Sequence, residues 1–250
     1  MGQLSEEIKA LIELNRGLER LGPGDAAFTK HILSILPELP QNPCIVDLGS
    51  GTGAGTLILA DWYKTKITAV DFSALFLAEL QSHAKSRGLD HLIRTEEKDI
   101  GNLNWPVASI DLLWSEGAAY NLTFEGALEA WRPLMAANGL AVISEISWFT
   151  DKIPGPVRVY WEKAYPAIAG ETENSRRANA AGFAVLDIHR LPTQAWWTNY
   201  YEPLKERIHI LRPSADPVMQ EVIDETEIEI ELLKNCKDSY GYSFYLLKAG

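Results

Sequence analysis

The most informative part of the sequence reads Ile45-Val46-Asp47-Leu48-Gly49-Ser50-Gly51-Thr52-Gly53. A short strand here runs into three alternating glycines, and a helical pattern begins near Thr56. Glycine permits positive φ and lets a ligand approach the backbone closely, while the start of a helix presents unpaired N–H groups. The stretch therefore predicts a cofactor-binding loop at the carboxyl end of the first strand of an open α/β sheet.

Strands and helices alternate around this loop. Such alternation is typical of βαβ units, which build a parallel sheet with helices on both faces. The expected strands are Cys44–Leu48, Lys66–Val70, Ile93–Lys98, Ile110–Ser115, Leu140–Ser144, Phe183–Ile188 and Tyr242–Leu247. The expected helices between the first five strands lie near Thr56–Tyr63, Ser73–Arg87 and Phe124–Met135.

The regions outside this alternation are also predicted to be largely helical. Residues 1–40 show helical spacing of apolar side chains and can start a second helix after Asp25. Residues 148–182 and 190–235 are rich in aromatic side chains and break the alternation, so we expect them to form a small cap. The length of the chain favours a single domain over residues 1–250.

Composition and charge exclude several classes of protein. The chain is 46% hydrophobic and 23% charged, values typical of a globular domain rather than a disordered or fibrous one. A formal net charge of −11 disfavours a nucleic-acid partner, because such binding uses Lys and Arg to neutralise phosphates. No stretch approaches the ~20 apolar residues of a membrane span, so we expect no membrane partner either.

Cysteine usage and the amino-terminal sequence bear on the compartment. Cys44 and Cys236 can form neither a disulfide framework nor a metal cluster, which favours a reducing environment and predicts no metal. The amino terminus has no apolar core of signal-peptide length. We therefore expect a cytoplasmic monomer or homodimer. The acidic run 216–231 holds seven carboxylates without Lys or Arg and is interpreted as a solvated helix face.

Three acidic residues stand at the ends of the first three expected strands. Asp47 lies two residues before the first glycine, where a carboxylate is awkward beside a pyrophosphate but useful beside an α-ammonium group. Asp71 can accept hydrogen bonds from ribose hydroxyls, and Asp99 can accept one from an adenine amino group. The loop also satisfies the relaxed dinucleotide fingerprint. An NAD(P)-binding oxidoreductase and a catalytically silent cofactor-binding protein therefore stay open as alternatives.

Several of these stretches resemble class I S-adenosylmethionine-dependent methyltransferases. The glycine loop looks like the first motif of that family, while Asp71 and Asp99-Ile100 resemble the second and third. Residues 110–117 resemble the fourth-strand motif and residues 134–145 the fifth. The resemblance implies a Rossmann-like sheet of seven mostly parallel strands and methyl transfer from S-adenosylmethionine, which leaves S-adenosylhomocysteine.

The resemblance extends toward the carboxyl terminus. Residues 240–245 look like the last strand of the family, which lies antiparallel to the others. Residues 145–169 resemble a bacterial subgroup that acts on small molecules. The resemblance therefore implies a small-molecule methyl acceptor.

What the resemblance implies for individual residues starts with the cofactor. The glycine loop would hold the methionine part and the ribose, and Asp47 would help bind the ammonium group. Asp71 would accept from the two ribose hydroxyls, with Phe72 against the adenine. The implied cofactor-binding residues are Asp47, Gly49, Ser50, Gly51, Gly53, Asp71, Phe72, Asp99, Ile100 and Ser115.

The methyl acceptor is predicted less closely, because methyl transfer depends mainly on positioning. A general base is needed only if the acceptor carries a proton on the attacking atom. Glu116 and Tyr120 follow the fourth strand at its ligand-binding end and are the candidate catalytic residues. Aromatic side chains beside carboxylates can bind an amine through cation–π contacts, but they can equally pack the cap onto the sheet. The candidate substrate-binding residues are Trp148, Tyr165, Trp197 and Tyr200.

Overall fold

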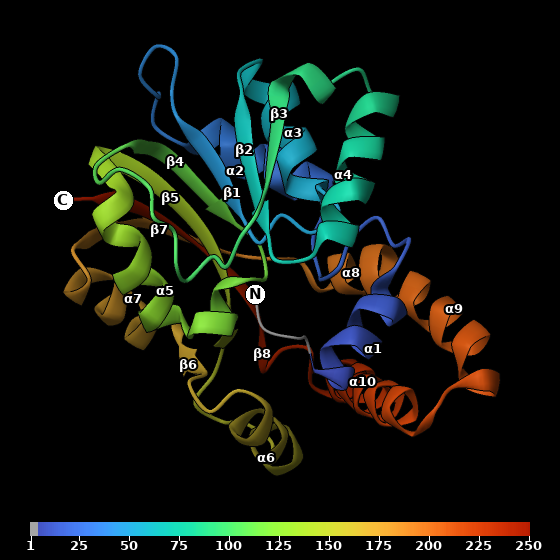
Figure 1. Cartoon of the computed structure of the whole chain (residues 1–250). Helices are drawn as coiled ribbons and strands as arrows, with labels where there is room; N and C mark the ends of the chain where they lie inside the picture. Colours follow the sequence, from blue (N-terminus) through green and yellow to red (C-terminus); the bar gives the residue numbers. More distant parts are fainter. Residues whose placement is uncertain (1–4) are drawn as a thin grey trace.

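The computed structural model describes residues 5–250 and is built around one mixed sheet (Figure 1). The order of its strands is β3-β2-β1-β4-β5-β8-β7, and the short β6 pairs with β5 outside this path. The strands are β1 (Ile45–Leu48), β2 (Ile67–Asp71), β3 (Ile93–Glu97), β4 (Ile110–Ser115), β5 (Met135–Trp148), β6 (Ala169–Gly170), β7 (Phe183–Arg190) and β8 (Tyr240–Ala249).

The direction of the strands matches the predicted fold. β1 pairs in parallel with β2 and β4, β2 with β3, and β4 with β5. β8 is antiparallel to both of its neighbours, β5 and β7. The predicted sheet of seven mostly parallel strands with an antiparallel last strand is therefore confirmed, and β6 adds an eighth strand of two residues.

Helices cover both faces of the sheet because its central strands are buried on both sides. Ile45 of β1 packs in a core with α2 (Ala26–Ile35) and α3 (Ala54–Tyr63). The next residue, Val46, points to the opposite core with α5 (Phe124–Trp131). This alternation fixes which strand ends and which helix ends meet at the glycine loop.

The amino-terminal segment packs over the site. α1 (Glu6–Asn15) is capped by Ser5, and Asp25 caps α2. Between these helices, the carbonyl oxygens of Leu18 and Glu19 accept hydrogen bonds from Thr52 Oγ1 at 3.2 and 2.9 Å. The chain before α2 therefore lies directly on the glycine loop. Residues 1–4, which the sequence predicts as part of this helical region, lie outside the described residues.

The aromatic-rich regions form further helices. α7 packs against β7 and α5, so it covers the sheet. α10 contacts α1 and α6, and α1 also contacts α9, so the first helix lies against helices that are about two hundred residues later in the sequence (Figure 1). The helices of these regions are α6 (Gly155–Ala164), α7 (Glu171–Ala180), α8 (Thr193–Trp196), the π-helical η4 (Trp197–Tyr201), α9 (Glu202–Leu211) and α10 (Pro217–Cys236); α4 (Ala74–Ser86) lies outside them, between β2 and β3.

Short 3-10 turns complete the described part of the chain. They are η1 (Asp90–Leu92), η2 (Ala119–Leu122), η3 (Arg132–Leu134) and η5 (Arg212–Ser214). Over residues 5–250, none of the helices combines the length and the apolar character needed to cross a membrane.

Candidate functional site

The glycine loop joins β1 to α3 at the carboxyl end of the parallel strands. Gly49, Gly51 and Gly53 have φ angles of 78°, 51° and 92°, all in the left-handed region that favours glycine. The N–H groups of Gly49 and Ser50 donate to the carbonyl oxygen of Val70 at 2.8 and 3.0 Å. The loop is therefore folded back across the end of β2.

Close neighbours also require glycine in this loop. A Cβ on Gly49 would lie 2.2 Å from the Cβ of Ala118, and one on Gly53 would lie 2.0 Å from Leu80 Cδ1. The first contact joins the loop to the segment after β4, and the second joins it to α4. The missing side chains thus let three parts of the chain meet around the start of α3.

Asp71 holds the glycine loop from the end of β2. Its Oδ2 accepts from the Gly51 N–H at 2.9 Å, and its Oδ1 accepts from the Ser73 N–H at 2.9 Å. Burial raises the pKa of this carboxyl, and the backbone hydrogen bonds oppose that rise. The next residue, Phe72, leaves 43% of its surface exposed, which is high for a large apolar ring. An acceptor group and an open aromatic face thus stand side by side.

Asp47 is a buried carboxyl beneath the loop. Its Oδ2 accepts a hydrogen bond of 2.6 Å from Thr56 Oγ1 on the first turns of α3. Burial raises the pKa of Asp47 to about 7; the bond from Thr56 opposes the rise, and the nearby Glu116 and Asp71 carboxylates add to it. A cationic group placed here would stabilise the ionised form of Asp47.

The remaining predicted cofactor residues lie near these two acids. Ser50 Oγ is buried without a hydrogen-bond partner, and Ser115 Oγ donates to the Leu48 carbonyl oxygen at 2.9 Å. The Lys98 N–H donates to the Asp71 carbonyl oxygen at 3.1 Å, which places the exposed Asp99 beside the end of β2. The Ile100 carbonyl oxygen accepts from Trp131 Nε1 at 2.8 Å.

Glu116, a predicted catalytic residue, is held by three side chains. Its Oε1 accepts from Trp114 Nε1 at 2.9 Å and from Thr29 Oγ1 at 3.1 Å, while Arg20 forms an ion pair with Oε2 at 3.1 Å. Arg20 and Thr29 come from the amino-terminal segment, and no sequence pattern indicated them. The contacts tie that segment to the end of β4, beside the glycine loop.

Tyr120 and Tyr165 meet on the other side of the β4 end. Their rings pack edge to face with centroids 6.3 Å apart, and Tyr120 keeps 43% of its surface exposed. Tyr165 is buried, and its hydroxyl oxygen accepts from the Phe124 N–H at 3.0 Å. Burial and the neighbouring Glu145 carboxyl raise the pKa of this hydroxyl, and sequence reasoning did not single out Glu145. Of the predicted catalytic residue Tyr120 and the predicted substrate residue Tyr165, only Tyr120 has an exposed ring.

Glu145 is a buried carboxyl near the end of β5. It is 1% exposed, and its Oε2 has no hydrogen-bond partner. Burial raises the pKa of Glu145 to about 8, against the hydrogen bond from Tyr165 and the charge of Arg177. The carboxyl is therefore largely protonated at neutral pH.

The remaining predicted substrate residues belong to one aromatic cluster. Trp148 packs on Tyr240 at 6.2 Å between centroids, Trp197 on Tyr201 at 5.5 Å, and Tyr200 on Tyr201 at 5.2 Å. We call this set the aromatic cluster, and it consists of Trp148, Tyr160, Trp161, Trp196, Trp197, Tyr200, Tyr201, Tyr240 and Tyr242. Helices and strands that are distant in sequence thus contribute to the aromatic cluster.

A carboxylate of α10 enters this cluster. Glu229 Oε1 accepts from the Tyr201 hydroxyl at 2.6 Å, and Oε2 accepts from the Tyr160 hydroxyl at 3.5 Å. Burial raises the pKa of Glu229, and burial together with the Glu229 charge raises the pKa of Tyr200. Glu229 is therefore an exception to the solvated face predicted for the acidic run.

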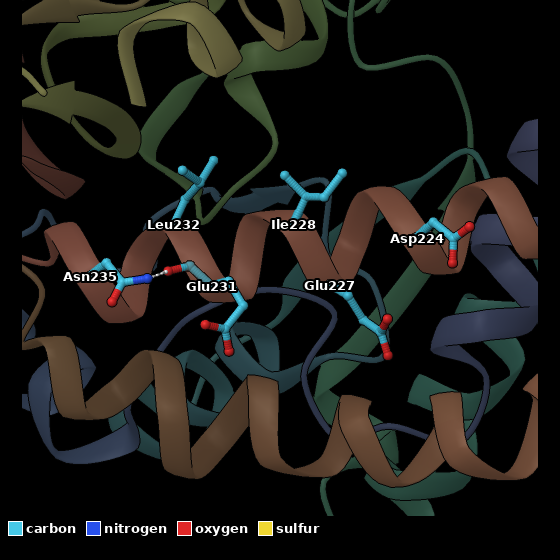
Figure 2. Close-up of a pocket in the computed structure, with 6 residues that line it drawn as sticks. All are labelled: Asp224, Glu227, Ile228, Glu231, Leu232 and Asn235. Atoms are coloured by element: carbon cyan, nitrogen blue, oxygen red, sulfur yellow. Dashed lines mark hydrogen bonds between the residues drawn. The ribbon is translucent and has the colours of Figure 1, made fainter. Parts of the chain in front are cut away.

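A separate groove runs along α10 and, unlike the aromatic cluster, is lined mainly by acidic and aliphatic side chains (Figure 2). Two of its carboxylates, Asp224 and Glu227, form ion pairs with Arg212 at 2.8 and 2.7 Å. Figure 2 shows Asn235 donating to the Glu231 carbonyl oxygen within the same helix, at 2.8 Å. Its carboxylates pair with Arg212 and Lys234, which lie outside the groove, and its lining comes from one helix. Over residues 5–250, no group of His, Cys, Asp and Glu is arranged to hold a metal ion.

Comparisons with known proteins agree with this geometry. Residues 45–139 match the family model of a methyltransferase domain. A dimethylglycine N-methyltransferase from Parasynechococcus marenigrum is 32% identical over 90 residues, which are 35% of this chain and 31% of that protein. The chain thus spans about a third of the length of that curated relative.

Solved structures resemble the chain over nearly all its length. YjhP from E. coli gives a TM-score of 0.80 at 18% identity, covering 97% of this chain and 100% of that one. The [4+2]-cyclase SpnF gives 0.75 at 17% identity, covering 97% and 94%. Other structures of this fold are methyltransferases that hold S-adenosylmethionine or S-adenosylhomocysteine. Residues 45–139 are therefore similar to a methyltransferase domain, and the chain shares the fold of these methyltransferase structures.

Proposed function

We propose that this chain is an S-adenosylmethionine-dependent methyltransferase that acts on a small molecule. The observation that carries the proposal is the glycine loop bonded to the Asp71 carboxylate through Gly51. The loop supplies backbone without side chains and Asp71 supplies a buried acceptor. Both stand at the carboxyl end of parallel strands, where ligands bind in open α/β folds.

The residues present fit this cofactor. Ser50 Oγ is a buried polar atom without a partner in the loop, and Asp47 is a buried carboxyl suited to an ammonium group. Asp71 and Asp99 would accept from the ribose and the adenine amino group, with Phe72 against the ring. S-adenosylmethionine bound there would supply a methyl group on a positively charged sulfur.

The protein's own task in such a reaction is positioning and the exclusion of water. We propose that Glu116 acts by holding the amino-terminal segment over the loop, since Arg20, Thr29 and Trp114 already bind its carboxylate. Tyr120 would face the acceptor with its open ring. Trp148, Trp197 and Tyr200 would line the acceptor's side of the site through the aromatic cluster, and the buried Tyr165 would support Tyr120 from behind.

The setting of the reaction is also part of this proposal. The net charge of −11 disfavours a nucleic-acid acceptor. We propose a monomer or homodimer that works in the cytoplasm on a metabolite, with residues 148–182 and 190–235 contributing the cap.

A labelling experiment tests the proposal. The purified protein is incubated with S-adenosylmethionine carrying a radioactive methyl group and with fractionated cell extract. We expect label in a low-mass fraction; label in RNA or protein would contradict the small-molecule acceptor. Because SpnF has this fold and is a [4+2]-cyclase, binding of the cofactor without any methylated product would favour another activity. Calorimetric titration with NADH tests the dinucleotide alternative.

Asp71→Asn should weaken the binding of S-adenosylhomocysteine about 10- to 100-fold, because hydrogen bonds to a charged group contribute about 1.5–3 kcal/mol. The amide nitrogen of Asn cannot accept from the Gly51 N–H, the Ser73 N–H or a ribose hydroxyl. Isothermal titration calorimetry measures the effect. Asp90→Asn changes an exposed acid on the turn before β3 and serves as the matched control. Equal affinity of the two variants would remove Asp71 from the site.

A further inference from the structure

Glu229 differs from its acidic neighbours on α10. Asp224 and Glu227 pair with Arg212, and Glu231 pairs with Lys234 at 3.1 Å. Within residues 5–250, Glu229 forms no ion pair with Lys, Arg or His, and its carboxylate accepts hydrogen bonds from two tyrosine hydroxyls only. A carboxyl with little access to water either keeps its proton or needs a partner of opposite charge to ionise. The unpaired Glu229 therefore points to a cation that the chain itself does not supply.

The two hydrogen bonds to the Glu229 carboxylate leave part of its accepting capacity free. Tyr201 binds Oε1 closely at 2.6 Å, but Tyr160 lies at 3.5 Å from Oε2, the outer limit of a hydrogen bond. Two further polar atoms of the cluster, Tyr240 Oη and Trp161 Nε1, are buried without partners. A ligand with N–H groups or a polar head would satisfy groups that the protein leaves open.

Aromatic rings surround this acid. Tyr160 packs edge to face on Trp161 at 5.2 Å between centroids, and Trp161 packs on Tyr240 at 5.3 Å. The faces of Tyr and Trp rings attract ammonium groups, most strongly where water is excluded. A carboxylate among such rings combines both means by which proteins bind an alkylammonium group.

The surroundings of Glu229 connect to the end of β4. Tyr201, which binds Glu229, packs on Trp196 at 5.8 Å, and Trp196 stacks on Tyr242 at 5.3 Å. The Tyr242 hydroxyl would lie 3.6 Å from a Cβ placed on Gly117, directly after Glu116. Packed aromatic rings thus lead from the acid of α10 to a tyrosine hydroxyl close to Gly117, near the end of β4.

We propose that Glu229 and the aromatic rings around it bind an ammonium group of the methyl acceptor. This inference rests on the proposed function and narrows its acceptor to a small molecule that carries a cationic amine. Glu229 is here a specificity-determining residue that recognises charge. The proposal places the recognising carboxylate on α10, more than a hundred residues after the Glu116 position that the sequence favoured.

The test compares choline and tetramethylammonium with 3,3-dimethyl-1-butanol, in which a carbon replaces the charged nitrogen of choline. Binding is measured by tryptophan fluorescence and calorimetry, with and without saturating S-adenosylhomocysteine. We expect choline to bind at least about tenfold more tightly than its neutral isostere. Glu229→Gln should weaken choline binding by a similar factor while S-adenosylhomocysteine affinity stays unchanged. Glu231→Gln, on the same helix, is the control.

The outcomes separate the two proposals. If S-adenosylhomocysteine binds but neither cation binds better than the neutral isostere, the ammonium site is wrong and the proposed function stands. If S-adenosylhomocysteine itself does not bind, the proposed function fails. Glu229→Asp keeps the charge and shortens the side chain, so it should retain more choline affinity than Glu229→Gln. Equal choline affinity in Glu229→Gln and the wild type would overturn the role of Glu229. If Glu229→Gln does not fold, equal binding of choline and its neutral isostere by the wild type would overturn it.

Discussion

Gly49→Ala is expected to lower the free energy of unfolding by about 2–5 kcal/mol. Two costs add up at this position. Gly49 has φ of 78°, where a side chain costs about 1–2 kcal/mol. Its new Cβ would also stand 2.2 Å from the Cβ of Ala118, a short side chain that cannot rotate away. One of the two segments must therefore move, and the glycine loop would lose its fit to the end of β4.

Urea unfolding followed by circular dichroism measures this loss of stability. Two further variants separate the backbone cost from the cost of the contact with Ala118. Gly88 has φ of 68° and no atom within 4 Å of a built Cβ, so Gly88→Ala measures the backbone cost alone. Gly49→Ala combined with Ala118→Gly should recover the part caused by the contact. If Gly49→Ala lowers the free energy of unfolding no more than Gly88→Ala does, the contact with Ala118 does not constrain the loop.

Much of the fold could be predicted from local patterns. The glycine loop and the apolar strands around it are contiguous in sequence, and most strand boundaries fall within a few residues of the prediction. The helix predicted to end at Met135 instead ends at Trp131 and continues as a 3-10 turn through Leu134. Pro133 explains this, because proline cannot donate the N–H bond that would continue the α-helix.

The site was predicted less completely where partners are distant in sequence. Arg20 and Glu116 are 96 residues apart, and no sequence pattern around either residue indicates that they interact. The burial of Glu229, by contrast, could have been predicted from the sequence. This residue lies seven residues after Val222 and four before Leu233, both buried, so the helical period places it on the inner face of α10. Treating the acidic run as one solvated face overlooked this periodicity.

Glu145→Gln is expected to become progressively more stable than the wild type as the pH rises from about 5 to about 8. Burial raises the pKa of Glu145 from 4.5 to about 8 in the folded protein. Between these values the unfolded chain is ionised while the folded one keeps its proton, so unfolding releases a proton. The wild type therefore loses up to about 1.4 kcal/mol of stability per pH unit in this window. Above about pH 8 both states are ionised and the loss stops.

Glutamine resembles the protonated carboxyl in shape and cannot ionise, so the variant should match the wild type at about pH 5 and surpass it by several kcal/mol at about pH 8. Urea unfolding of both proteins across this range measures the difference. Asp47, whose pKa is also raised, to about 7, is present in both proteins and cancels. Glu129→Gln removes an exposed carboxylate and should show a difference that does not change with pH. A pH-independent difference for Glu145→Gln as well would mean that Glu145 ionises in the folded protein near its ordinary pKa, with water or a movement of Tyr165 compensating its burial.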